Sequence, residues 1–238
     1  MKNGLWSRLM APFMVGKYPQ NSDGPLLFGC ELESILMKPS APAEASGALE
    51  VCAELAKLPG TVPTLDHGHV VAVQHSNWPA VVTMDAGRNV TEFIYSPGSS
   101  LHDFEAETRR MMGIAIPAAT RRGYAYVGTG THPLLNVHEG TWNPRPRYGA
   151  LQHYLIQGGH ETTRTASTQV TVDARHPGHL LAMLNVGNGL AGPIAALFAN
   201  SGIVAGTIRE DDLASRVDPP VGVETAGGFE AVTPDAYV

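Results

Sequence analysis

Two glutamates separated by one residue, in the segment Phe28-Gly-Cys-Glu-Leu-Glu33, are the first side chains that could do chemistry. In a β-strand, residues i and i+2 share a face, so Glu31 and Glu33 would project together while Cys30 points the opposite way. Two carboxylates on a rigid strand can hold a hard cation such as Mg²⁺, which prefers oxygen ligands and commonly bridges to substrate phosphates. An amphipathic strand with a solvated acidic face explains the same spacing, so the pattern leaves both interpretations open.

A third carboxylate, Glu92, lies in a second segment that runs from Met84 to Tyr95. With strand periodicity, Glu92 would share a face with Val90 and Ile94. A carboxylate on an apolar face is costly unless it is paired or bound to a metal. Glu92 is therefore either the partner of a cation such as Arg88 or a third metal ligand.

Polar side chains also alternate along residues 167–173, where Gln169, Thr171 and Asp173 would line one face and two valines the other. This pattern is typical of a strand with a polar stripe toward solvent. Beside the two acidic strands, the same stripe would complete a polar cradle over a sheet. Such a cradle suits a charged cofactor, and the spacing is compatible with both interpretations.

The periodicity of apolar residues along the chain predicts the elements that position these strands. Alternating β-branched residues predict strands, and apolar residues that recur every three to four positions predict helices. The predicted strands are 26–37, two or three within 69–95, 124–127 and 165–174, and the predicted helices are 43–58, 100–122, 148–157 and 177–199. Ser100, with Asp103 three residues on, is expected to cap the second helix. The pattern predicts an α+β fold with an antiparallel sheet, in one domain that comprises residues 1–238.

Residues 180–208 contain no charged side chain, a feature that transmembrane helices share. Asn185, Asn188, Pro193 and several glycines argue against a membrane span, so the segment is predicted to form a buried helix of a soluble protein. Within it, the glycines at 187, 189 and 192 match the spacing of a dinucleotide-binding fingerprint. The residues before them are poor in β-branched side chains, which disfavours the strand that a Rossmann fold requires.

The formal net charge of −6 comes from the end of the chain. Residues 210–238 hold seven acidic residues against Arg216 alone, and the other residues hold 15 acids and 15 bases. The sequence thus lacks the basic stripe of a nucleic-acid-binding protein. Its two cysteines are too few for a disulfide framework, and its first residues lack the sustained apolar run of a secretory signal. We expect a cytoplasmic protein.

Taken together, these segments resemble the plant-type and actinobacterial glutamate–cysteine ligase family. The resemblance includes the acidic strand Gly-Cys-Glu-Leu-Glu (29–33) and the second acidic strand, residues 83–93. It continues with Gly-Thr-Gly-Thr-His-Pro (128–133), Arg147-Tyr148, residues 164–173 and Ala-Leu-Phe-Ala-Asn-Ser (196–201). Each motif is short, and the order of all six makes the resemblance specific.

The resemblance implies a glutamine-synthetase-like antiparallel sheet, flanked by helices, that forms a cradle for ATP and Mg²⁺. It also implies that ATP phosphorylates the side-chain carboxylate of glutamate, and that an amine such as that of cysteine attacks the acyl phosphate to form an amide. No nucleic acid or membrane takes part. Residue by residue, it assigns Glu31, Glu33 and Glu92 to the metal, Arg147 and Arg164 to phosphate or substrate carboxylate, and Gln169, Asp173, Asn200 and Ser201 to the cofactor.

The sequence also departs from the family. Gly202-Ile203 follows Asn-Ser where the family has Pro and Phe, and either Arg209 or Arg216 could match a later family arginine. The family continues with a long C-terminal part, so the chain is expected to be truncated relative to the family, with a partner chain or self-association completing the site. Two alternatives stay open: an amide ligase with other substrates in specialised metabolism, and a truncated, non-catalytic homologue that binds nucleotide or a partner.

Overall fold

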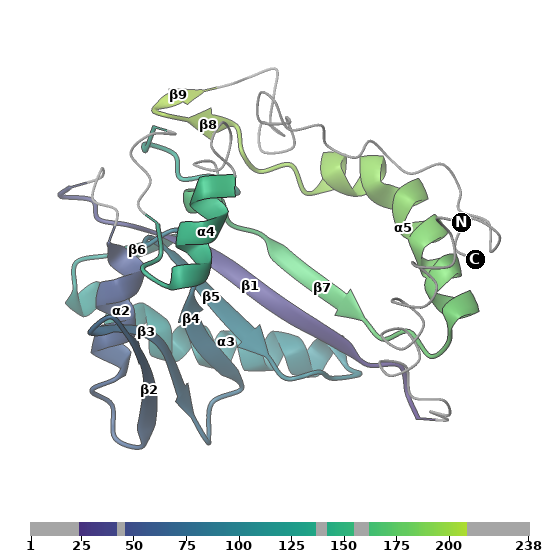
Figure 1. The fold of residues 1–238 in the computed structure, drawn as a ribbon, viewed down its shortest axis with the longest axis horizontal. Helices are drawn as coiled ribbons and strands as arrows, with labels where there is room; N and C mark the ends of the chain where they lie inside the picture. Colours follow the sequence, from purple (N-terminus) through teal and green to yellow (C-terminus); the bar gives the residue numbers. More distant parts are fainter. Residues whose placement is uncertain (1–23, 42–45, 137–141, 155–161, 209–238) are drawn as a thin grey trace.

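The molecule is built on an antiparallel sheet of seven strands (Figure 1). The computed structural model describes residues 24–41, 46–136, 142–154 and 162–208. The strands of the sheet are β1 (Phe28–Met37), β2 (Thr61–Asp66), β3 (His69–His75), β4 (Ala80–Met84), β5 (Val90–Tyr95), β6 (Ala125–Val127) and β7 (Thr168–Val172). Their order is β2-β3-β4-β5-β1-β6, and β7 also pairs with β1. A separate hairpin consists of β8 (Ile203–Val204) and β9 (Thr207–Ile208).

β1 is the central strand of the arrangement. One of its edges pairs with β5. Along the other edge, its first half pairs with β7 and its last residues pair with β6. β1 therefore carries its glutamates between two neighbouring strands, which hold the backbone around them rigid.

Helices α2 (Gly47–Leu55) and α3 (Leu101–Arg121) cover one face of the sheet. The core between them contains Leu55 of α2, Met111 of α3, and Leu36 and Phe93 of the sheet, all fully buried. Figure 1 shows α3 passing behind the strands and α4 (Pro146–Tyr154) in front of them. The α+β class with a large antiparallel sheet flanked by helices is confirmed.

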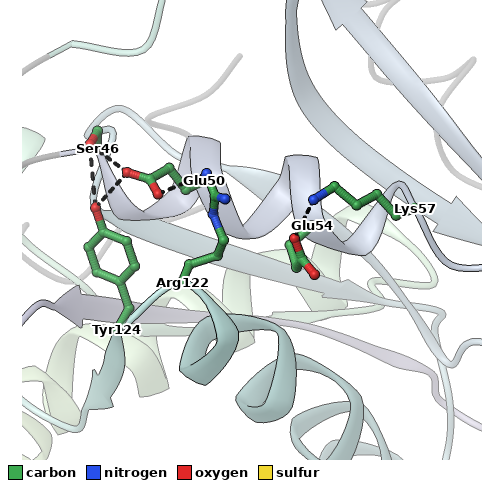
Figure 2. A network of polar contacts seen from close by, with 6 residues as sticks. All are labelled: Ser46, Glu50, Glu54, Lys57, Arg122 and Tyr124. Atoms are coloured by element: carbon green, nitrogen blue, oxygen red, sulfur yellow. Dashed lines mark hydrogen bonds and ion pairs between the residues drawn. The ribbon is translucent and has the colours of Figure 1, made fainter.

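Polar contacts fasten α2 to the end of α3 and to the segment that follows it (Figure 2). Glu50 accepts a hydrogen bond of 2.9 Å from the Tyr124 hydroxyl and forms an ion pair of 3.1 Å with Arg122. Ser46 donates to the same carboxylate at 3.3 Å. The predicted Ser100 cap is confirmed as well, since its hydroxyl oxygen accepts from the Asp103 amide at 3.2 Å.

Three strands were not predicted, namely β2 and the two strands of the β8–β9 hairpin, and the bounds of α2 and α4 differ from the predicted ones. β2 contains Pro63, which disfavours a strand assignment, and an edge strand accommodates proline because its outer side needs no hydrogen bond. The hairpin between β2 and β3 turns through His67 and Gly68, both with positive φ. α2 is shorter than the predicted 43–58, of which residues 42–45 lie outside the described part, and α4 begins two residues before the predicted 148.

The prediction of a buried helix over residues 180–208 is wrong. The helix exists as α5 (Pro177–Leu197), but none of its residues from Gly178 onward is buried. By length and composition alone, Gly178–Leu197 could cross a membrane, with a mean hydropathy of 1.5. A charge-free sequence predicts an apolar helix but carries no information on which surface covers it.

The three glycines of the fingerprint lie inside this helix rather than between a strand and a helix, which rules out the dinucleotide interpretation. The acidic segment 210–238, Arg209 and Arg216 lie outside the described residues.

Candidate functional site

The three predicted metal ligands lie on the face of the sheet that α2 and α3 leave uncovered. Glu33 of β1 is directly opposite Glu92 of β5. Glu31 is opposite Ile94 of β5 on one side and Gln169 of β7 on the other. Directly opposed residues of antiparallel strands share a face, with Cβ atoms roughly 5 Å apart. The strand pairing therefore brings together carboxylates that are about 60 residues apart in the sequence.

Gln169 of β7 and Ser167, which directly precedes this strand, hold the carboxylate of Glu33 in place. The backbone N–H and the hydroxyl of Ser167 donate to its Oε2 at 2.7 and 2.9 Å. The side-chain amide of Gln169 donates to its Oε1 at 2.5 Å. Glu33 is 9% exposed, so these hydrogen bonds replace the water that burial removes.

Glu92 has a different environment, although it is equally buried. Burial raises its pKa to about 7, and the negative charges of Asp85, Glu31 and Glu33 add to the effect. Arg88, the alternative partner predicted for Glu92, donates through its Nε to the Trp142 carbonyl at 2.7 Å. Glu92 therefore accepts a proton far more readily than an ordinary glutamate, and the site carries a surplus of negative charge.

A cleft of about 520 Å³ adjoins the acidic face. It is lined by Glu31 and Asp173 as the charged residues, with Thr171 beside them and apolar walls that include Ile94 and Pro97. Thr171 is opposite Gly29 in the sheet, where the missing side chain leaves space over β1. The polar stripe predicted for residues 167–173 thus faces the glutamates, as the cradle hypothesis requires.

The carboxylates are close together but do not form a preassembled metal centre. Among the described residues, no three His, Cys, Asp or Glu side chains converge in an arrangement that could hold an ion.

Residues 142–148 fasten onto the hairpin that carries Glu92. The side-chain amide of Asn143 donates to the carbonyls of Met84 and Asp85 at 2.9 and 2.8 Å. Arg145 follows and donates to the hydroxyl of Thr83 at 3.2 Å. Thr83 is itself opposite Glu92 in the sheet. The loop before α4 thereby brings basic side chains to the acidic face.

Arg147 reaches this site through Tyr148. Its guanidinium donates to the Tyr148 hydroxyl at 2.5 Å and lies 4.5 Å from the centroid of the same ring. The Tyr148 hydroxyl in turn donates to Asp85 at 3.4 Å. Burial, followed by the charge of Asp85, raises the pKa of Tyr148, so this hydroxyl stays protonated at neutral pH.

Arg164, which is predicted to contact phosphate or a substrate carboxylate, is buried in the structure. It is 3% exposed, and its guanidinium donates to the Leu135 carbonyl at 3.4 Å. Its own carbonyl accepts from the amide of His132 at 2.7 Å. Burial and the charge of Arg164 lower the pKa of His132 to about 4, so this histidine is neutral.

Asn200 and Ser201 pack against the glycine-rich loop after β6. The Asn200 side chain donates to the Gly128 carbonyl at 2.5 Å, and its backbone carbonyl accepts from Gly130 at 2.7 Å. A Cβ on Gly130 would lie 2.5 Å from the Ser201 hydroxyl oxygen, so any other residue there would displace the Ser201 side chain. These two residues are therefore joined to the 128–130 loop, and neither lines the cleft.

Sequence reasoning missed three residues of the site: Asp85, Tyr148 and Ser167. Asp85 lies in the same sequence motif as Glu92, which is the signal that could have identified it. Tyr148 directly follows Arg147 in the shared motif, and the resemblance assigns a role to Arg147 only. Ser167 was placed on the predicted strand, and the signal that could have identified it is its spacing of two residues from Gln169.

Comparison with known proteins identifies the family of the chain. The model of glutamate–cysteine ligase family 2 matches residues 27–216. The chain belongs to glutamate–cysteine ligase family 2. Among solved structures, a glutamate–cysteine ligase from Francisella tularensis in complex with AMP is similar, with 11% identity and a TM-score of 0.46. The match covers 75% of this chain and 35% of that ligase, so the chain corresponds to about a third of its length. No curated protein matches the sequence significantly.

The match to glutamate–cysteine ligase family 2 includes all of the predicted site residues, from Glu31 to Ser201. It also includes Asp85, Tyr148 and Ser167, which the structure adds to the acidic face.

Proposed function

We propose that this chain carries the cation- and nucleotide-binding strands of an ATP-dependent ligase that joins a carboxylate to an amine, of the γ-glutamyl–cysteine type. The observation that carries the proposal is the pairing of Glu33 with Glu92 on a sheet face that also presents Glu31, with Arg147 anchored to the same hairpin. Membership of glutamate–cysteine ligase family 2 supports it.

The donor chemistry of the acidic face fits Mg²⁺. Glu31, Glu33 and Glu92 offer hard oxygen donors, and the raised pKa of Glu92 records negative charge that a divalent cation would offset. These three residues would hold the ion, and Glu33 would bind through an oxygen that already accepts hydrogen bonds from Ser167. When bound, Mg²⁺ would neutralise phosphate charge during transfer.

The reaction has two steps. The terminal phosphoryl group of ATP moves to an oxygen of the donor carboxylate, and ADP leaves. The amine nitrogen then forms a bond to the acyl carbon, and inorganic phosphate and a proton leave. In this scheme Arg147 binds the phosphoryl group or the substrate carboxylate, and Gln169 and Asp173 orient ligands over the sheet. Such positioning and charge stabilisation supply most of the rate enhancement in phosphoryl transfer.

The roles assigned to Arg164, Asn200 and Ser201 stay predictions. Arg164 is buried, so we expect it to support the loop that borders the anion rather than to be exposed to solvent in the free protein. Asn200 and Ser201 would act on a ligand together with the 128–130 loop that they hold. Completion of the site by a partner chain or by self-association, and a cytoplasmic location, belong to the same proposal.

Phosphate release tests the proposed reaction. The full chain is incubated with Mg²⁺, ATP and glutamate, with and without cysteine, and both phosphate and the amide product are measured. Phosphate release that requires glutamate, with a γ-glutamyl product, supports the proposal. Release with other carboxylates or amines supports an amide ligase of different specificity. ATP binding without any phosphate release supports the non-catalytic alternative and contradicts the proposed reaction.

A further inference from the structure

Arg147 is an exposed side chain that nevertheless has a defined place. Exposed arginines ordinarily sample many rotamers, and fixing one costs conformational entropy. Here the guanidinium lies over the Tyr148 ring, 4.5 Å from its centroid, and donates to the hydroxyl of the same residue. Both contacts come from one neighbouring residue, so Tyr148 determines where Arg147 points.

Tyr148 is well suited to this task because it is itself immobile. Its side chain is 5% exposed, and it lies in the first turn of α4. Its hydroxyl faces the Asp85 carboxylate at 3.4 Å. The bonds from Asn143 to the carbonyls of Met84 and Asp85 hold the start of α4 against that hairpin.

The three side chains form a polar chain from Arg147 through the Tyr148 hydroxyl to Asp85. Asp85 lies close enough to Glu92 for its charge to act on that carboxylate. Arg147 is thus attached to the hairpin whose Glu92 faces Glu33, yet Tyr148 stands between its guanidinium and Asp85. A direct ion pair with Asp85 would neutralise the cation. Contact through a hydroxyl leaves the positive charge available to an anion.

We propose that Tyr148 is a positioning residue, which holds the Arg147 guanidinium at the acidic face for an anionic group of the substrate, either a phosphoryl group or a carboxylate. The proposal rests on the proposed function, since it assigns Arg147 the anion-binding role in the ligase. It adds to that function the residue on which the role depends.

The test is a double-mutant cycle on the full chain, read by calorimetric titration with Mg²⁺ and ATP. Tyr148→Phe keeps the ring under the guanidinium and removes the hydroxyl, and Arg147→Lys keeps the charge and removes the fork of donors. We expect each variant to weaken binding by about tenfold, the size expected for one hydrogen bond to a charged group. We expect the double variant to be no weaker than Arg147→Lys alone, because Tyr148 acts through Arg147.

Tyr124→Phe is the matched control. It removes a hydroxyl that is also bonded to a carboxylate, that of Glu50, in the α2 network on the other face of the sheet. Its affinity for Mg²⁺ and ATP should equal that of the wild type. A general loss of stability on removing a buried tyrosine hydroxyl would affect both variants, whereas positioning of Arg147 affects Tyr148→Phe only.

A second measurement separates this inference from the proposed function. In the ligand-free protein, nitrogen-15 NMR of the Arg147 side chain should show slower solvent exchange and less motion in the wild type than in Tyr148→Phe. Equal motion in both proteins overturns the inference, as does additivity of the two substitutions in the cycle. Failure of the wild type to bind Mg²⁺ and ATP overturns the proposed function, and the NMR comparison then decides the positioning by itself.

Discussion

Replacement of Glu92 by glutamine should stabilise the protein at alkaline pH. The pKa of this carboxyl is raised from 4.5 to about 7, first by burial and then by Asp85, Glu31 and Glu33. The folded state therefore binds a proton more tightly than the unfolded chain, so wild-type stability falls as pH rises from about 4.5 to about 7. At about 1.4 kcal/mol per pH unit, the charged carboxylate costs about 3 kcal/mol above this range.

The assay is urea denaturation of the wild type and of Glu92→Gln at a series of pH values. Near pH 4.5 the two proteins should have similar free energies of unfolding, because the wild-type carboxyl is protonated. At pH 8 the variant should be more stable, by up to about 3 kcal/mol. Glu54→Gln is the control of opposite sign, because hydrogen bonds from Lys57 and Arg121 lower the pKa of Glu54, so this variant should lose stability at pH 8. A Glu92→Gln variant that is equally or less stable than the wild type at pH 8 would refute the reasoning.

Two further predictions concern the residues that hold the site in place. His132 has a pKa lowered to about 4 from 6.5, so wild-type stability should fall by up to about 3 kcal/mol as pH drops through that range, and His132→Asn should lack this slope in denaturation curves. An unchanged slope would contradict a buried, neutral His132. Gly87→Ala should destabilise the fold by more than about 2 kcal/mol, since its Cβ would lie 1.8 Å from the Thr163 carbonyl oxygen. Gly149→Ala, which meets open space in α4, should instead gain about 0.5–1 kcal/mol, and equal thermal shifts for the two alanine variants would contradict this packing.

The sequence alone predicts those features of the site that follow from the periodicity of a strand. Alternation alone predicts that Glu31 and Glu33 share a face, and the structure agrees. It does not predict that Glu92 is opposite Glu33, because strand pairing depends on turns and on contacts between distant segments. Tyr148 and Asp85 are 63 residues apart, so their contact has no local signal in the sequence. The exposure of α5 could not be predicted either. The amino-acid composition of a helix shows that it is apolar, but not which other elements pack against it.

In β2, the position of the strand in the sheet overrides a local sequence preference. Pro63 argues against a strand, yet β2 forms at the edge of the sheet, where its alternating partners on β3 supply the hydrogen bonds on one side. The family resemblance assigns Arg164 to phosphate or substrate carboxylate, and the structure buries it beside the neutral His132, so its anion contact stays a prediction.

The central claim is that the acidic face formed by β1, β5 and β7 binds a nucleotide together with a divalent cation. Calorimetric titration with ATP, with and without Mg²⁺, tests it most directly on the wild type and on the double variant Glu31→Gln/Glu33→Gln. We predict that the wild type binds ATP only with Mg²⁺ and that the double variant loses this binding. Mg²⁺-independent binding, or binding that survives in the double variant, would contradict the claim that these carboxylates hold the cation.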